Sequence, residues 1–263
     1  MRLTVLGTGT ARPVADTAAS GLLIRSGESA VLFDCGSGIA ARLVEVQPVE
    51  GLDGLVVGHL HADHWIDLAP LRYRFPWGEP APRRLPVHLP PGARPKVDAL
   101  ATAINERPGF FDAAFEIREY ASGEAFRVGE LTVRPMPVGH YVPAWSMDIR
   151  GPDGARIVYA GDMGPSEAVV ELARGADLLI LEATLERAEF DDPRRGHLTT
   201  EEAIDHAERA GVPQALLVHF PSERREAIEA ICAATGDRVR PARVGETVDV
   251  PAALGAAVKA AAS

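Results

Sequence analysis

The chain has 263 residues, of which 46% are apolar and 24% charged, and its formal net charge is −10 at pH 7. That length and composition predict an ordinary globular protein with a large hydrophobic core. The negative charge argues against a large nucleic-acid partner, which needs a basic surface. It still allows a small anionic substrate in a cleft that bound cations make positive.

The sequence shows no sign of a membrane or secreted protein. No apolar run approaches the roughly 18 residues of a membrane span, and the N-terminal MRLTVLGTGT leads straight into a strand-like pattern without a signal peptide. Cys35 and Cys232 stand far apart and outside CxxC spacing, which argues against a disulfide framework and a thiolate zinc site. We therefore expect a cytoplasmic protein without membrane contact.

The first half of the chain is predicted to be rich in strands. The periodicity and turn residues favour strands over 2–6, 21–26, 30–34 and 52–58 and a helix over 38–46. The proline-rich stretch from about 76 to 110 is expected to run over the surface.

The second half alternates strands with helices. Strands are predicted over 114–120, 130–138, 145–151, 155–162, 176–184 and 214–220, and helices over 166–175, 199–211 and 222–236. Thr199 and Glu202 form a capping box at the start of one helix, and Gly211 is suited to end it. We predict a single domain, 1–263, of two similar halves, in which two sheets pack face to face with helices outside.

The stretch VVGHLHADHW, residues 56 to 65, places three histidines and an aspartate after an apolar run. His59 and His61 point the same way in an extended loop, and Asp63 and His64 turn towards a second position. Imidazole suits zinc and similar divalent metals, and carboxylate adds neutralising charge. Four such groups can serve two metals but cannot saturate them, so further ligands are expected elsewhere.

Three more ligating residues end strand-like runs: His140 in LTVRPMPVGH, Asp162 in RIVYAGD and His219 in ALLVHF. In α/β architectures the ends of strands form the crevice in which sites assemble. A lone histidine at a strand end is more often structural, but structural histidines have no reason to gather at one edge. The coincidence therefore predicts a shared metal site.

With these residues the sequence resembles the metallo-β-lactamase-fold hydrolases. The HxHxDH signature is complete, the three later ligands follow in order, and LGTGT and DCGSG also match, over residues 3 to about 220. The resemblance implies an α/β fold, a four-layer αββα sandwich, with two divalent metal ions, zinc or alternatively manganese. One metal would take His59, His61 and His140, the other would take Asp63, His64 and His219, and Asp162 would bridge them. The resemblance also suggests a homodimer.

Two later stretches resemble the ribonuclease Z-like branch. Glu182 in LILEATL stands where that branch has its HEAT loop, and His197 in RRGHLTTEEA stands where it has its HST loop. A histidine near the metals, oriented by a carboxylate, is suited to protonate a departing alkoxide. The alternative is that His197 only flanks a helix and that Glu182 is solvated. We predict Asp63, His197 and Glu182 as the catalytic residues.

The spacing of the motifs bears on the substrate. From His140 to Asp162 the chain advances 22 positions (162 minus 140), which leaves room for a hairpin but not for the tRNA-binding arm of ribonuclease Z. The early loop GTGTARPVADTAAS also lacks the lysine–arginine pattern of the tRNA-processing enzymes. The compact spacing is similar to that of small, arm-less phosphodiesterases. We expect cleavage of a small or cyclic, nucleotide-like phosphodiester by a metal-bridging hydroxide, with His197 as general acid.

Several alternatives stay open. The fold and metals also suit an acyl hydrolase such as a lactonase or thioesterase; a tRNA 3′ endonuclease and a non-catalytic binding protein are further alternatives. Asp34 either orients a metal ligand from behind or only shapes its glycine turn. Candidate substrate contacts are phosphate-binding arginines and loop aromatics, namely Arg72, Arg74, Arg194, Arg195, Phe75, Trp77 and Tyr141.

Overall fold

The computed structural model describes residues 1–74, 83–106 and 109–251. Two seven-stranded sheets form its centre, with the strand orders β14-β1-β2-β3-β4-β5-β6 and β13-β12-β11-β10-β9-β8-β7. The first sheet contains β1 (Arg2–Thr8), β2 (Ser20–Ser26), β3 (Ser29–Phe33), β4 (Gly54–Val56), β5 (Leu85–Leu89), β6 (Phe115–Glu119) and β14 (Thr247–Asp249). The second contains β7 (Phe126–Val128), β8 (Leu131–Val138), β9 (Ala144–Arg150), β10 (Arg156–Tyr159), β11 (Leu178–Glu182), β12 (Ala215–Val218) and β13 (Val239–Pro241).

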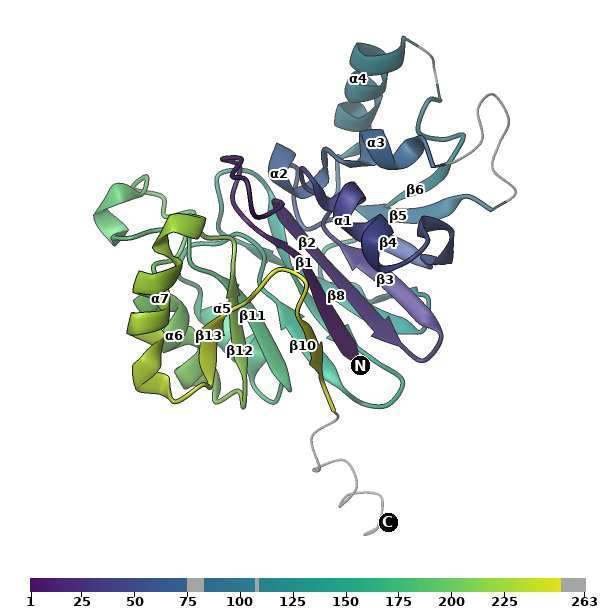
Figure 1. Ribbon diagram of the computed structural model, residues 1–263. Coiled ribbons are helices and arrows are strands. Elements are labelled where there is room, and N and C mark those ends of the chain that lie inside the picture. Colours follow the sequence, from purple (N-terminus) through teal and green to yellow (C-terminus); the bar gives the residue numbers. More distant parts are fainter. Residues whose placement is uncertain (75–82, 107–108, 252–263) are drawn as a thin grey trace, which may run out of the picture.

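The helices cover the outer faces of the sheets (Figure 1). On one side lie α1 (Ile39–Val46), α2 (Ala62–Trp65), α3 (Leu68–Arg72) and α4 (Arg94–Asn105). On the other side lie α5 (Glu167–Ala173), α6 (Thr200–Ala210) and α7 (Arg225–Cys232). The predicted αββα sandwich is therefore confirmed. Within the described ranges no helix is long and apolar enough to cross a bilayer.

Side-chain alternation along the strands explains the layers. On β2, Leu22 and Ile24 belong to the core between the sheets, whereas Leu23 between them packs with the helices outside. On β12, Leu216 faces the core between the sheets and Leu217 faces the outer helices of the second sheet. Strands that are apolar on both faces need cover on both sides, which the αββα arrangement provides.

The two sheets share one pattern of pairing. In the first sheet β14, β1, β2 and β3 pair antiparallel, and β3, β4, β5 and β6 pair parallel. In the second, β7 to β10 pair antiparallel and β10 to β13 parallel. Parallel neighbours end at the same edge of a sheet, so the loops after β4, β10 and β12 are brought to the edges where ligands can gather.

Helix α6 follows its sequence signals closely. Its N-cap Thr199 accepts from the backbone N–H of Glu202, while Glu202 accepts from the backbone N–H of Thr199 at 2.9 Å. Its C-cap Gly211 has a left-handed conformation with φ 68°. Both predictions for the ends of this helix are confirmed.

The prediction that the stretch from about 76 to 110 runs over the surface is wrong for part of it; residues 76–82 and 107–108 lie outside the described residues. The stretch contains β5, which lies inside the first sheet between β4 and β6, and helix α4. The prolines are tolerated for local reasons. Pairing of β5 with β4 begins only at Val87, after Pro86, and Pro95 stands at the start of α4, where a missing N–H costs no helical hydrogen bond.

Candidate active site

The residues predicted as metal ligands converge from both sheets. His59 follows β4, His61 is the N-cap of α2, and Asp63 and His64 lie within α2. The others follow strands of the second sheet: His140 after β8, Asp162 after β10 and His219 directly after β12. The ligating atoms form two groups, within each of which they lie no more than 4.8 Å apart: His59, His61 and His140, and Asp63, His64, Asp162 and His219.

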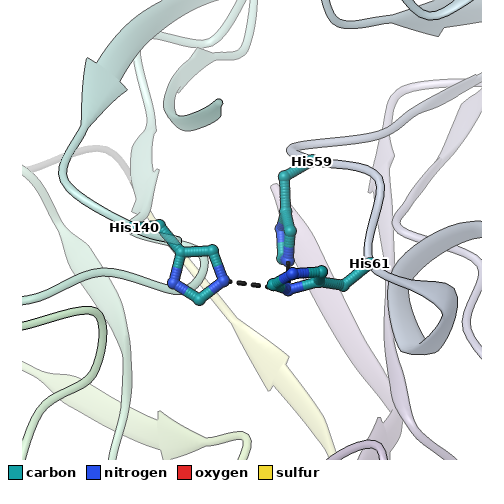
Figure 2. Close-up of side chains that lie close together, drawn as sticks. All are labelled: His59, His61 and His140. Carbon is teal, nitrogen blue, oxygen red and sulfur yellow. Dashed lines mark hydrogen bonds between the residues drawn. The ribbon is translucent and has the colours of Figure 1, made fainter. Parts of the chain in front are cut away.

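The first group is a cluster of three imidazoles (Figure 2). Nδ1 of His61 lies 3.2 Å from Nε2 of His59 and 3.0 Å from Nε2 of His140. The three rings meet edge to face, with centroids 4.8 to 4.9 Å apart. One nitrogen from each ring therefore points to a common centre.

The second group contains both carboxylates. Oδ2 of Asp63 lies 3.1 Å from Nε2 of His219. Oδ2 of Asp162 lies 3.3 Å from Nε2 of His64 and 3.3 Å from Nε2 of His219. The same oxygen lies 3.8 Å from Nε2 of His59 in the first group. Oδ2 of Asp162 thus lies near imidazoles of both groups, as a bridging ligand would require.

Three imidazoles are held from behind through Nδ1. His140 donates to the carbonyl oxygen of Gly196 at 2.7 Å, and His64 donates to Oδ2 of Asp34 at 2.8 Å. The hydroxyl of Thr184 donates to the carbonyl oxygen of His219 at 2.9 Å, so it accepts from Nδ1 of His219, also at 2.9 Å. Each of these contacts directs the lone pair of Nε2 into the site, as metal ligation requires.

The backbone is unusual at this site. Among the described residues other than glycine five have positive φ, and three of them are Asp34 (58°), Arg195 (53°) and His219 (47°). A side chain in this region is strained, and such strain concentrates at functional sites. Gly36 marks a close approach, because a Cβ there would lie 1.8 Å from the carbonyl oxygen of Asp63.

Electrostatics differ between the two groups. Burial lowers the pKa of His59, His61 and His140, so these imidazoles are neutral near pH 7. Burial acts in the same direction on His64, but the nearby carboxylates of Asp162 and Asp34 outweigh it and raise the pKa of His64 well above its usual value. The imidazoles of the first group are therefore neutral ligands near pH 7, whereas the carboxylates around His64 favour its protonated form.

His197 and Glu182 are paired next to the second group. Nδ1 of His197 donates to Oε1 of Glu182 at 2.8 Å, and that oxygen also accepts from the backbone N–H of Met163 at 2.9 Å. Burial lowers the pKa of His197, but the hydrogen bond and charge of Glu182 prevail and raise it to about 9. Glu182 is buried at the end of β11, so the interpretation of a solvated Glu182 is wrong.

A cavity of about 440 Å³ opens at the candidate site. Its lining includes Asp63, Asp162, His197 and His219, together with Thr10 and Ala11 from the loop after β1. The volume lies within the range of small-molecule sites. The predicted acid and four of the predicted ligands thus face one space that could hold a small substrate; these ligands are His61, Asp63, Asp162 and His219.

Of the candidate substrate contacts, Tyr141 lies beside the site, with its ring centroid 5.0 Å from that of His140, whereas the arginines contact other residues. Arg72 is buried and donates to the carbonyl oxygen of Phe110 at 2.7 Å, and Arg195 is paired with Glu202 at 2.7 Å. Arg74 lies 3.5 Å from a carboxylate oxygen of Glu50, and the guanidinium of Arg194 lies 5.8 Å from the ring centroid of Tyr141. Phe75 and Trp77 lie outside the described residues.

Comparison with known proteins shows the family. Residues 29–220 match the family described as "Beta-lactamase superfamily domain". The chain belongs to the β-lactamase superfamily. Within this superfamily it is a metal-dependent hydrolase of the metallo-β-lactamase fold.

Relatives in this superfamily match over most of their length. The chain is 32% identical to protein ML1173 of Mycobacterium leprae, over 96% of this chain and 89% of that protein. It is 31% identical to a ribonuclease Z of Mycobacterium bovis, over 84% of this chain and 86% of that protein.

Solved structures with the same fold superpose closely. The metallo-β-lactamase fold protein YhfI of Bacillus subtilis has a TM-score of 0.81 at 25% identity, over 94% of this chain and 98% of that one. The short form of human tRNase Z has a TM-score of 0.75 at 22% identity, over 95% and 100% of the chains. A diphosphatase of the PhnP family has a TM-score of 0.74 at 20% identity, over 95% and 98%. The last two show the likeness of fold alone.

The superfamily implies a bound divalent metal, and the donor atoms of this chain fit one. Imidazole nitrogens converge in the first group, and carboxylate oxygens neutralise charge in the second. Nδ1 of His64, His140 and His219 is hydrogen-bonded to a neighbouring group, which leaves Nε2 of each ring available as a ligand. Such a set suits zinc and other borderline divalent metals.

Proposed function

We propose that the protein is a dinuclear metal-dependent phosphodiesterase that cleaves small or cyclic, nucleotide-like phosphodiesters. The observation that carries this proposal is the 2.8 Å pairing of His197 with Glu182 beside the candidate metal ligands. An acid held at this place can protonate the alkoxide that leaves a phosphodiester, and the same pair is the feature that the sequence shares with the ribonuclease Z-like branch.

The two groups of ligands would each hold one metal. His59, His61 and His140 would hold the first, and Asp63, His64 and His219 the second, with Asp162 between them. Divalent ions bound there, zinc by preference of these donors, would supply Lewis-acid charge and an activated water next to the phosphate.

The chain's own residues would supply the proton. His197 carries a proton at neutral pH because its pKa is raised to about 9. Glu182 fixes the ring through Nδ1, which leaves Nε2 to donate to the departing oxygen. Glu182 is itself fixed by the backbone N–H groups of Met163 and Thr184 at 2.9 and 3.3 Å. The carboxylate therefore orients the acid and keeps it protonated.

The size and charge of the molecule support a small substrate. The cavity measures about 440 Å³, and the net charge of −10 disfavours a long polyanion. Between His140 and Asp162 the chain forms the antiparallel pair β9 and β10. This hairpin follows the spacing expected from the sequence and leaves no segment for an RNA-binding arm. We also propose that residues 1–263 act as one domain, because both sheets supply ligands.

Cleavage of RNA is the second candidate function. It is favoured by the ribonuclease Z relative at 31% identity. A precursor tRNA with a 3′ trailer distinguishes the two proposals, since a small-substrate enzyme should leave it uncut while cleaving a cyclic nucleotide.

The test compares bond types on protein of measured zinc content. The substrates are a cyclic nucleotide, bis(p-nitrophenyl) phosphate, a p-nitrophenyl ester and a lactone. We expect His197→Ala to reduce kcat for the cyclic nucleotide by at least about 10²-fold. The loss for bis(p-nitrophenyl) phosphate should be smaller, because nitrophenolate leaves without a proton.

Arg194→Ala is the matched control on the same loop, since this side chain is 71% exposed. It should behave as the wild type. Turnover of the ester or lactone that exceeds phosphodiester cleavage and is indifferent to His197 would establish the acyl-hydrolase alternative instead.

A further inference from the structure

Asp191 is a buried carboxylate on the loop that carries His197. It follows the short helix η2 (Ala188–Phe190), and its side chain is only 2% exposed. Its Oδ2 accepts from the backbone N–H of Gly196 at 2.8 Å and from that of His197 at 3.1 Å. A buried charge needs such partners, and Asp191 has two more on the same loop: Nε of Arg195 lies 3.5 Å from Oδ2, and the backbone N–H of Asp192 donates to Oδ1 at 2.8 Å.

The peptide unit between Gly196 and His197 has a second partner. Its N–H donates to Asp191, and its carbonyl oxygen accepts from Nδ1 of His140 at 2.7 Å. The carboxylate of Asp191, the Gly196–His197 peptide and the imidazole of His140 thus form a chain of hydrogen bonds. A carboxylate that accepts from a peptide N–H polarises that peptide, which strengthens its carbonyl as an acceptor. A stronger acceptor at Nδ1 makes Nε2 of His140 a better metal ligand.

Gly196 lets this peptide reach His140. A Cβ at Gly196 would lie 2.5 Å from Cζ of Tyr141, whose ring lies against the peptide. The same ring has its centroid 5.0 Å from that of His140 and 5.5 Å from that of His197. Tyr141 therefore fills the space beside both histidines and closes the loop over them.

We propose that Asp191 is a positioning residue that fixes, through the Gly196–His197 peptide, both the metal ligand His140 and the proton donor His197. The inference rests on the proposed function for the role of His197, and on His140 as a ligand for the metal. Asp191 touches neither substrate nor metal, so its effect passes through the two histidines. The charge of Asp191 determines how strongly the Gly196–His197 peptide is polarised, and the shape of its side chain determines the position of the loop.

The adjacent Asp192 provides a matched control. Its side chain is 43% exposed and pairs with Arg194 at 3.0 Å, away from the peptide. Asp191→Ala removes both charge and acceptor, whereas Asp191→Asn keeps an oxygen acceptor and loses the charge. Asp192→Asn makes the same change of charge one position away.

The first measurement is zinc affinity by competition with a chromogenic chelator. Asp191→Ala should weaken the binding of one zinc equivalent by about 10- to 100-fold, Asp191→Asn should weaken it less, and Asp192→Asn should not change it. The second measurement is the ratio of kcat for a cyclic nucleotide to kcat for bis(p-nitrophenyl) phosphate. This ratio should fall in Asp191→Ala, because displacement of His197 slows expulsion of the alkoxide of the cyclic nucleotide more than expulsion of nitrophenolate.

Unchanged zinc affinity and an unchanged kcat ratio in folded Asp191→Ala would overturn the proposal and leave Asp191 as a cap of its loop. If Asp191→Ala does not fold, Asp191→Asn decides by the same two readouts. The two proposals can fail separately. A wild-type protein that cleaves neither phosphodiester refutes the proposed function. The difference in zinc affinity between the variants at 191 and 192 still tests whether Asp191 positions His140.

Discussion

Oδ2 of Asp34 lies 2.8 Å from Nδ1 of His64 and so fixes the direction in which that imidazole faces the site. The same oxygen accepts from the hydroxyl of Tyr159 at 2.7 Å. Asp34→Asn should weaken zinc binding by about 10- to 100-fold, since an amide carries no charge and has one acceptor oxygen, whereas the carboxylate also accepts from the backbone N–H of Gly58 through Oδ1 at 2.9 Å. Chelator competition measures this. Tyr159→Phe is the comparison and should have a smaller effect; equal affinity in Asp34→Asn and wild type would contradict the expectation.

The hydroxyl of Thr184 orients His219. Thr184→Val keeps the shape of the side chain but removes the partner of Nδ1, so we expect weaker binding of one zinc equivalent. Thr184→Ser keeps the hydroxyl and should bind zinc as the wild type does. Zinc titration of the two variants side by side measures the contribution of the hydroxyl alone, and identical curves would show that His219 needs no such support.

The raised pKa of His197 predicts how activity depends on pH. Because the protonated imidazole is the acid, kcat for a cyclic nucleotide should fall as pH rises through the pKa of the folded protein. This alkaline limb should lie at or below pH 9, since the pKa is raised to about 9 without metal and bound cations oppose the protonated ring. Glu182→Gln should move the limb to lower pH, because it removes the charge that raises the pKa. A limb that does not move would argue against the pair.

Gly36 allows the HxHxDH loop to pack closely. Gly36→Ala would place a Cβ 1.8 Å from the carbonyl oxygen of Asp63, and this backbone cannot move without shifting the ligand. We expect a loss of about 1–3 kcal/mol or more in the free energy of unfolding, together with weaker zinc binding. Gly51→Ala is the control, because no heavy atom lies within 4 Å of its Cβ position. Urea denaturation of both variants gives the comparison.

The fold, and the residues that gather at the candidate site, could be predicted from the sequence for a simple reason. Ligating residue types directly follow apolar runs, and parallel strands bring their ends to shared edges. His59, His140, Asp162 and His219 could therefore be associated across 160 positions (219 minus 59) without knowledge of any contact. Residues 85–89 could not be recognised as a strand, because Pro86 is a residue type that interrupts most strands, although the pairing there does not need its N–H.

Apart from Asp34, the supporting residues had no such signal. Thr184 lies in the stretch that singled out Glu182, yet its contact with His219 depends on how two loops meet. Asp191 is one of two neighbouring aspartates, and only the loop conformation decides which of them is buried. Strands β13 and β14 have three residues each, too few for alternation to stand out. Such features depend on tertiary contacts that local patterns do not encode.

The ligands of each group come from both sheets, and this has a thermodynamic consequence. A cation held by His61 and His140, or by His64 and His219, joins the two sheets as a cross-link that the unfolded chain cannot reproduce. Its binding energy adds to the stability of the native state by an amount that grows with the logarithm of free metal concentration. Removal of metal by a chelator should lower the melting temperature as well as the rate. The stability of the folded protein should therefore depend on the free metal concentration as well as on temperature.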